Sequence, residues 1–97
     1  MEKVLLPNGS VVLLKNAEKR LMICGWYPVT EDGLEFDYLS HPYPEGYIDE
    51  DSTLLFNHKE IERIDFIGFV DAEYQIFASD VAKEIKKQDF FNNEKNK

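Results

Sequence analysis

Cysteine and long apolar runs are almost absent from this chain. With Cys24 as its single cysteine the chain forms no intramolecular disulfide, and the apolar residues before it predict a buried, unreactive thiol. The longest apolar runs have four residues, far fewer than the roughly 20 of a membrane-spanning helix. Only Val4-Leu5-Leu6 precedes Pro7, which is too short for a secretory signal. We therefore expect a cytoplasmic protein.

Basic residues are absent from the middle of the chain. No lysine or arginine lies between Leu21 and His58, and the eight carboxylates there equal the formal net charge of −8. A field of one sign repels nucleic acid and anionic membranes, so we expect a protein partner of positive or mixed charge. The eight carboxylates are Glu31, Asp32, Glu35, Asp37, Glu45, Asp49, Glu50 and Asp51.

Motifs for catalysis and cofactor binding are also missing. The glycines are too isolated for a phosphate-binding loop. Counting from Asp49, Leu54 occupies the sixth position, where a calcium-binding EF-hand loop needs glycine. The two histidines have no partners at zinc-site spacing. We predict no catalytic residue, cofactor or metal; the alternative is a small hydrolase-like enzyme that uses His58 with Glu60 or Asp65.

The length and composition predict a single folded domain. The 97 residues are 43% hydrophobic and include seven phenylalanines, which is enough for one small core. The last six residues, 92–97, have no apolar anchor. We expect one α+β domain at 1–91 and a disordered tail at 92–97.

Turn residues and apolar runs predict three antiparallel strands in the first half. A turn at Pro7–Ser10 precedes a strand at Val11–Leu14. A second strand covers Leu21–Cys24 and continues to Pro28. The Asp-Gly pair in Glu31–Gly33 then predicts a hairpin turn, after which Leu34–Tyr38 alternates as a third strand.

The second half predicts two more strands around a helical turn. Prolines and a glycine make Ser40–Ser52 irregular, and Thr53–Phe56 is a short strand. Asn57 and Glu60 form a capping box that begins a turn at 58–62, with Phe56 and Ile61 as its hydrophobic staple. A last strand follows at Arg63–Gly68.

A final amphipathic helix begins after Asp71, its expected N-cap, and places apolar residues from Tyr74 to Ile85 on one face. The predicted fold is therefore α+β: a strongly bent antiparallel sheet, or an SH3-like barrel, of about five strands. One helical turn precedes the last strand, and the amphipathic helix is C-terminal. The predicted core is Val12, Leu14, Met22, Phe36, Phe56, Ile61, Ile64, Phe66, Phe77 and Val81.

The stretch between Leu21 and His58, which has no basic residue, also holds the only tryptophan and four of the five tyrosines. We predict that this stretch carries the partner-binding surface. Aromatic side chains supply affinity, while the surrounding acids accelerate encounter with a basic partner. The competing candidate is the C-terminal helix, whose apolar face could contact a helical partner. The predicted surface comprises Trp26, Tyr38, Tyr43, Tyr47, Asp49, Glu50 and Asp51.

Five blocks of sequence, taken together, resemble one protein family. It is a small, functionally uncharacterised family of Gram-positive bacteria, a domain of unknown function encoded beside LXG-type toxins and type VII secretion genes. The resemblance runs from about Leu6 to Phe69, and the helix after Asp71 lies outside it. The blocks are Leu6–Lys15, Lys19–Gly25, Asp37-Tyr38 with Tyr43–Gly46, Phe56–Ile61 and Phe66–Phe69.

The resemblance implies a cytoplasmic, non-enzymatic accessory protein that binds an LXG-type toxin for type VII secretion, as a chaperone or targeting adaptor. It equally permits an immunity protein that binds the toxic domain. It supplies no catalytic residues, and it leaves the oligomeric state open. At Gly25-Trp26-Tyr27 the chain departs from the family pattern, which has a polar residue after the glycine. That departure would suit a surface adapted to one particular toxin.

Overall fold

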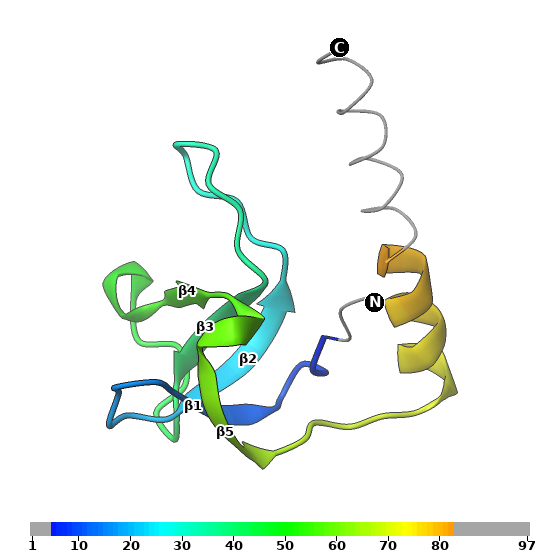
Figure 1. Cartoon of the computed structure of the whole chain (residues 1–97), viewed down its shortest axis with the longest axis horizontal. Helices are drawn as coiled ribbons and strands as arrows, with labels where there is room; N and C mark the ends of the chain where they lie inside the picture. The colour runs from blue at the N-terminus through cyan, green and yellow to red at the C-terminus, as the bar shows by residue number, and fades with distance from the viewer. Residues whose placement is uncertain (1–4, 83–97) are drawn as a thin grey trace.

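Five strands and a helix make up most of the structure, a computed structural model that describes residues 5–82. The strands form one antiparallel sheet, and the helix at 72–82 follows the last of them (Figure 1). Single-turn 3-10 helices, η1 (Glu50–Ser52) and η2 (His58–Glu60), lie on either side of β4 in the chain. The strands are β1 (Val11–Leu14), β2 (Leu21–Trp26), β3 (Tyr38–Pro42), β4 (Leu54–Phe56) and β5 (Ile61–Phe66).

The sheet has the strand order β4-β3-β2-β1-β5, and every neighbouring pair is antiparallel. This is the strand order of an SH3-like barrel, but the sheet is open, because β4 and β5 form its two edges. Register shifts between Ile23 and Gly25, and at two points of the β1–β5 pair, interrupt the ladder and bend it. The predicted α+β class with a bent sheet of five strands is confirmed, in its open form.

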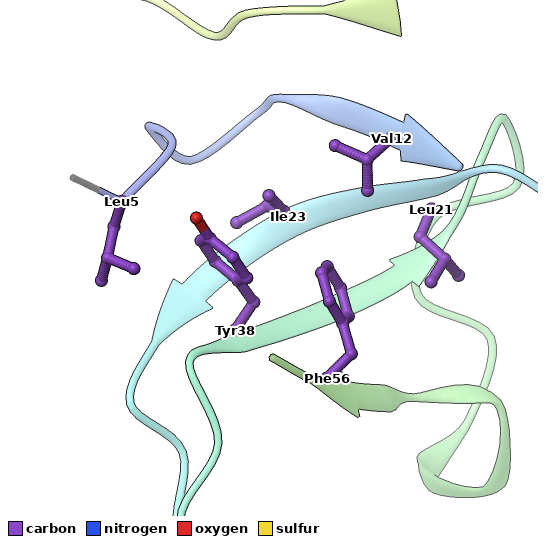
Figure 2. Packing of buried hydrophobic residues seen from close by; sticks show 6 residues of the cluster. All are labelled: Leu5, Val12, Leu21, Ile23, Tyr38 and Phe56. Atoms are coloured by element: carbon purple, nitrogen blue, oxygen red, sulfur yellow. The ribbon is translucent and has the colours of Figure 1, made fainter. Parts of the chain in front are cut away.

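The hydrophobic core lies against one face of this sheet (Figure 2). Leu21 and Ile23 alternate along β2 and are both buried, as the period of a strand requires. The ring of Tyr38 packs against that of Phe56 with 5.1 Å between centroids. The buried cluster comprises Leu5, Val12, Leu21, Ile23, Tyr38 and Phe56.

The predicted core is right at Val12 and Phe56, which are fully buried. Leu14 and Ile61 are partly buried and pack against the cluster, as predicted. Three further predicted members are only half-buried, namely Met22, Phe36 and Val81.

The core prediction is wrong for Ile64, Phe66 and Phe77, whose side chains are 45%, 60% and 52% exposed. Ile64 and Phe66 lie on β5, which is an edge strand of the sheet. A neighbouring strand, β1, is present along one of its edges only. Leu21 and Ile23 were missed because a continuous apolar run does not reveal which alternate residues face the core.

The third strand lies further along the chain than the sequence predicts. β3 begins at Tyr38, and residues 27–37 form a hairpin arm with one isolated bridge, between Val29 and Glu35. The predicted turn is present at the tip of this arm, where Gly33 N donates to Thr30 O at 2.9 Å. Ser40–Pro42 was predicted to be irregular but forms the end of β3. The strand tolerates the proline because Pro42 is its last residue.

Both predicted helix starts are confirmed. At η2, Asn57 N donates to Glu60 Oε2 at 2.7 Å, which is the bond of the expected capping box. At the helix 72–82, Tyr74 N donates to Asp71 Oδ1 at 2.8 Å, so Asp71 is its N-cap. The remainder of the predicted helix, with Ile85, and the predicted tail at 92–97 lie outside the described residues.

Replacement of Gly46 by alanine should lower the free energy of unfolding by about 1 kcal/mol, because an alanine disfavours left-handed backbone. Gly46 has a φ of +79°, and no atom lies within 4 Å of an added Cβ, so the cost is conformational rather than steric. Urea denaturation would measure the change. Gly25→Ala is the control, since its φ is ordinary; equal stability of Gly46→Ala and the natural protein would contradict the prediction.

Candidate functional site

The sheet divides the predicted partner surface between its two ends. In the β2–β3 pair, Trp26 lies opposite Tyr38 at one end, and Leu21 lies opposite Pro42 at the other. The segment that begins at Tyr43 leaves from the Pro42 end, so the length of β2, about 16 Å, separates it from Trp26. In Figure 1 the helix beside Trp26 is on the right and the β3–β4 loop is on the left. The seven predicted residues therefore do not form one surface.

Residues 43–53, here called the acidic loop, join β3 to β4. The guanidinium group of Arg20 lies over the ring of Tyr43, and the distance from Arg20 Cζ to the ring centroid is 4.9 Å. Tyr47 is 63% exposed and meets His41 edge-on at 5.2 Å between centroids. Lys19 also reaches Glu45, with 2.7 Å between Nζ and Oε1, and lowers the pKa of that carboxyl through the hydrogen bond. Two basic side chains thus already contact this loop.

The three consecutive acids of the acidic loop have different roles. Asp49 Oδ1 accepts from Ser52 N at 2.8 Å, so its side chain caps η1 and is a structural group. Glu50 and Asp51 lie in η1 with exposed side chains. Of the predicted acids, these two are the ones available to a partner.

Trp26 attaches the helix 72–82 to the sheet. Its indole Nε1 donates to Leu6 O at 2.8 Å. Its ring stacks on Phe77 at 5.3 Å between centroids and meets Tyr74 edge-on at 5.9 Å. Tyr74 in turn donates its hydroxyl proton to Leu5 O at 2.9 Å. The described part of the helix therefore packs on its own domain, through Trp26.

Tyr38 belongs to the core rather than to a partner surface, since its side chain is fully buried. The hydroxyl accepts from Leu6 N at 2.9 Å and lies 2.6 Å from His58 Nδ1. Burial raises the pKa of Tyr38 to about 12. The hydroxyl therefore keeps its proton at neutral pH, and it forms a hydrogen bond with Nδ1 of His58.

The surroundings of His58 bind η2 to the start of β3. Asp37 is buried, and its Oδ2 accepts a hydrogen bond from His58 N at 2.8 Å. The backbone N–H of Asp37 donates to Asn57 Oδ1 at 3.1 Å. Glu60 and Asp65, the proposed orienting groups of a His58 enzyme, bond instead to Asn57 N and to Arg63. The contacts of His58 therefore hold η2, which connects β4 to β5, against the start of β3.

Replacing Tyr38 by phenylalanine should lower the free energy of unfolding by about 2 kcal/mol at neutral pH, because Leu6 N and His58 Nδ1 lose their common partner. The loss should shrink at alkaline pH. An unfolded tyrosine releases its proton near pH 10 and the folded one near 12, so the natural protein loses stability between these values while the variant lacks this effect. Urea denaturation at pH 7 and pH 11 tests both statements; a gap that is constant or widens with pH would contradict the second.

Metal-binding clusters and membrane-spanning helices are both absent from the described residues. Within 5–82, no group of three or more histidine, cysteine, aspartate or glutamate side chains could hold a metal ion. No helix in the same range is long and apolar enough to cross a bilayer. Cys24 is half-buried, donates its thiol proton to Leu39 O at 3.5 Å, and has a pKa raised by burial. That shift disfavours the reactive thiolate.

The largest group of exposed apolar side chains lies where the sequence placed core residues. Residues 64–77, here called the apolar segment, run from β5 through an extended connection into the helix (Figure 1). They contain seven of the twelve exposed large hydrophobic residues among those described, so the exposure is concentrated. These seven are Ile64, Phe66, Ile67, Phe69, Val70, Ile76 and Phe77.

One sequence signal could have revealed the apolar segment. Phe66-Ile67 and Phe69-Val70 are adjacent apolar pairs, so their side chains alternate to both sides of an extended chain. A strand at the edge of a small sheet cannot bury both sides, and the pairs therefore had to be exposed in part.

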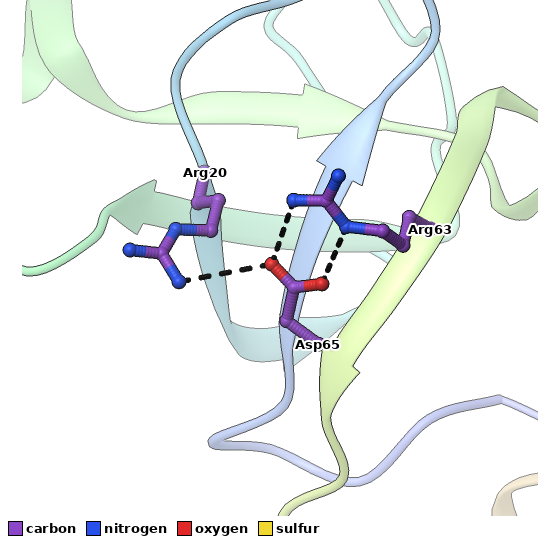
Figure 3. Close-up of polar contacts among 3 residues, drawn as sticks. All are labelled: Arg20, Arg63 and Asp65. Atoms are coloured by element: carbon purple, nitrogen blue, oxygen red, sulfur yellow. Dashed lines mark hydrogen bonds and ion pairs between the residues drawn. The ribbon is translucent and has the colours of Figure 1, made fainter.

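Charged side chains cover the part of β5 that precedes these pairs (Figure 3). Asp65 Oδ1 accepts from Arg63 Nε at 2.6 Å, and its Oδ2 lies 3.7 Å from Arg20 Nη1. The hydrogen bond from Arg63 lowers the pKa of Asp65 and raises that of Arg63. Charges of this kind on an edge strand discourage pairing with another strand.

A close backbone contact fixes the middle of the apolar segment. Gly68 N donates to Ser10 Oγ at 2.9 Å, and Ser10 Oγ donates to Pro7 O at 2.7 Å. The predicted turn at Pro7–Ser10 therefore does two things: it begins β1, and it holds the connection between β5 and the helix.

A family model described as a domain of unknown function (DUF4176) matches residues 5–77. The match covers the whole sheet and, beyond the blocks recognised in the sequence, the helix as far as Phe77, so the apolar segment lies inside it. Comparisons with curated proteins and with solved structures find no match. Because the match spans 73 of the 97 residues, the chain belongs to the family of this domain of unknown function, DUF4176.

Proposed function

We propose that this protein is a non-enzymatic accessory protein of the cytoplasm that binds an LXG-type toxin for type VII secretion, as a chaperone or targeting adaptor. The secretion setting comes from the family resemblance of the sequence blocks. The binding function rests on the structure, in one observation above others: the exposure of the apolar segment.

The apolar segment supports a binding function because soluble domains rarely expose so many large apolar residues within a short stretch. Phe69 is 79% exposed, Ile76 64% and Ile67 55%. Complete burial of a fully exposed side chain of this kind is worth about 1.5–3 kcal/mol, and each of these side chains forgoes the part that corresponds to its exposed fraction. A partner that covers several of them gains enough to offset the loss of free motion on association.

The acidic loop contributes in a different way. Glu50, Asp51 and the exposed ring of Tyr47 lie at the far end of the sheet from the helix. Together with the net charge of −8 they attract a basic partner from a distance, and salt screens that attraction within about 10 Å. We assign affinity to the apolar segment and long-range attraction to the acidic loop.

The non-enzymatic character is supported by how the candidate catalytic groups are used. Tyr38 and Asp37 hold His58 through its Nδ1 and its backbone N–H. These bonds fasten η2 to β3, which is a structural use of the histidine.

The test is co-purification with separately expressed halves of an LXG-type toxin from the same organism. A chaperone or adaptor binds the N-terminal targeting half, and its deletion stops export while the producing cell survives. Binding to the C-terminal toxic half, with death of the producing cell on deletion, would instead identify an immunity protein. Absence of binding to both halves would refute the proposal.

A further inference from the structure

On the basis of this protein-binding function, we propose that the apolar segment binds an amphipathic helix of the partner that carries basic residues beside its apolar face. The inference concerns the chemistry of the partner, and three features of the described residues lead to it: the charge around the segment, the edges of the sheet, and the arrangement of the helix 72–82.

The charge around the apolar segment has one sign. Between Arg63 and Lys83 the sequence has no basic residue and four acids, Asp65, Asp71, Glu73 and Asp80. Of these, Asp65 is already paired with Arg63, and Asp71 caps the helix 72–82. A partner that covers the apolar side chains must bring its own surface close to the remaining two acids, Glu73 and Asp80, and basic residues there are complementary.

The acids also lie in register with the exposed apolar residues. On a helix, positions three and four apart share a face, so Glu73, Ile76 and Asp80 form one row on the helix 72–82. All three side chains are exposed, and Ile76 lies between the two acids. On the partner, an apolar side chain flanked by two cations matches this row.

The edges of the sheet favour a helix over an added strand. β4 has only three residues, and β5 carries a charged pair and two register shifts against β1. Short length, charge and bulges are the features that prevent another chain from extending a sheet. A helix satisfies its own backbone and presents a row of apolar side chains, so it needs no free edge.

A second copy of the chain is a poor occupant for the same electrostatic reason. In a symmetric dimer the same patch faces itself, which would bring the acidic row of one copy, with Glu73 and Asp80, close to that of the other. Like charges in contact oppose association. The segment is therefore assigned to a different chain.

Synthetic peptides test the charge and the helical form directly. The first is about 18 residues long, free of tryptophan, with leucines on one helical face and lysines beside them. The second has glutamates in place of the lysines, and the third has the first composition in scrambled order. Trp26, the only tryptophan of the protein and stacked on Phe77, reports binding by its fluorescence. We expect the second and third peptides to bind at least about tenfold more weakly than the first.

Variants of the protein then locate the contact. Ile76→Asp and Phe69→Asp should each weaken binding of the first peptide about tenfold. Leu34→Asp is the matched control, because Leu34 is 59% exposed in the hairpin arm, and it should leave the Kd unchanged within about twofold.

A pair of charge reversals separates contact from general attraction. At physiological salt, Glu73→Lys with Asp80→Lys should weaken binding about tenfold, whereas Glu50→Lys with Asp51→Lys, the same change of net charge, should change the Kd less than about threefold. Equal losses from the two pairs would overturn the inference. So would equal binding of all three peptides, or self-association of the protein that the Ile76 and Phe69 variants abolish.

These outcomes remain distinct from a failure of the proposed function. If a toxin half co-purifies and the Ile76→Asp and Phe69→Asp variants retain it, the proposed function stands and this inference is wrong. If neither half binds while the peptides follow the expected order, the proposed function is wrong and the specificity for a basic helix stands.

Discussion

Gly68→Ala should be the most damaging single-methyl change in the chain, lowering the free energy of unfolding by about 3 kcal/mol and the melting temperature by about 15 °C. An added Cβ would lie well inside van der Waals contact of the Asn8 carbonyl oxygen and 3.1 Å from Ser10 N. Both neighbours are backbone atoms of the Pro7–Ser10 turn, so no flexible side chain can move aside. Relief requires the connection to shift, which breaks the bond from Gly68 N to Ser10 Oγ.

Thermal and urea denaturation measure this effect, with Gly25→Ala as the matched control. The Cβ added at Gly25 meets Leu39 Cβ at 3.6 Å, an ordinary contact, so the same chemical change there should cost no more than about 0.5 kcal/mol. Ser10→Ala keeps the space but removes the hydroxyl that links Pro7 O to Gly68 N, and should cost about 1–2 kcal/mol. A Gly68→Ala protein as stable as the Gly25→Ala control would show that the two segments are not in close contact.

The change at Gly68 also connects stability with binding. Gly68 lies in the middle of the apolar segment, so a shifted connection moves Ile67 and Phe69 relative to the sheet. The Gly68→Ala protein should therefore bind the basic amphipathic peptide more weakly even at temperatures where its sheet is folded. The Gly25→Ala control should bind as the natural protein does.

The sequence predicted the features whose cause is local. The capping box at Asn57 and Glu60, the N-cap Asp71 and the turn before Gly33 all depend on residues within four positions of one another. Their hydrogen bonds form whatever the rest of the chain does. The class of fold followed from the number and spacing of such elements.

Features that depend on register could not be predicted in this way. The sequence indicated a strand at Leu34–Tyr38, but pairing with β2 and β4 places β3 at Tyr38–Pro42. That displacement separates Trp26 from the acidic loop, so the proposed single surface became two. The same register explains why the side chain of Tyr38 is buried. Tyr38 lies opposite Phe56 in the β3–β4 pair, and this position, rather than the type of residue, turns its side chain toward the core.

The edge position of β5 was equally hidden. Ile64 and Phe66 have the alternation of a core strand, and only the structure shows that they lie on an edge strand with side chains 45% and 60% exposed. The sequence therefore assigned to the core the residues that now carry the proposed binding surface.

Trp26→Ala should lower the free energy of unfolding by about 3 kcal/mol and release the helix 72–82 from the sheet. The substitution removes the hydrogen bond to Leu6 O, the stacking on Phe77 and the edge contact with Tyr74. Tyr74 would remain attached only through its bond to Leu5 O, which is worth about 1 kcal/mol. Most of the stability of a surface helix comes from tertiary packing of this kind, so the helix should open when the packing is lost.

Amide hydrogen exchange distinguishes release of the helix from general unfolding. In the Trp26→Ala protein, protection should fall over residues 72–82 while the paired amides of β1 and β2 keep most of theirs. Tyr47→Ala is the matched control, because it also removes an aromatic ring but one that is 63% exposed in the acidic loop. It should change the stability by no more than about 0.5 kcal/mol and leave exchange of the helix unaltered.

Because Ile76 and Phe77 are presented by this helix, its release should also abolish binding of the basic peptide, detected by calorimetry in the absence of the indole. If the helix keeps its protection without Trp26, the indole is not what positions the apolar segment, and the hydrogen bonds of Gly68 and Tyr74 must hold the binding surface in place.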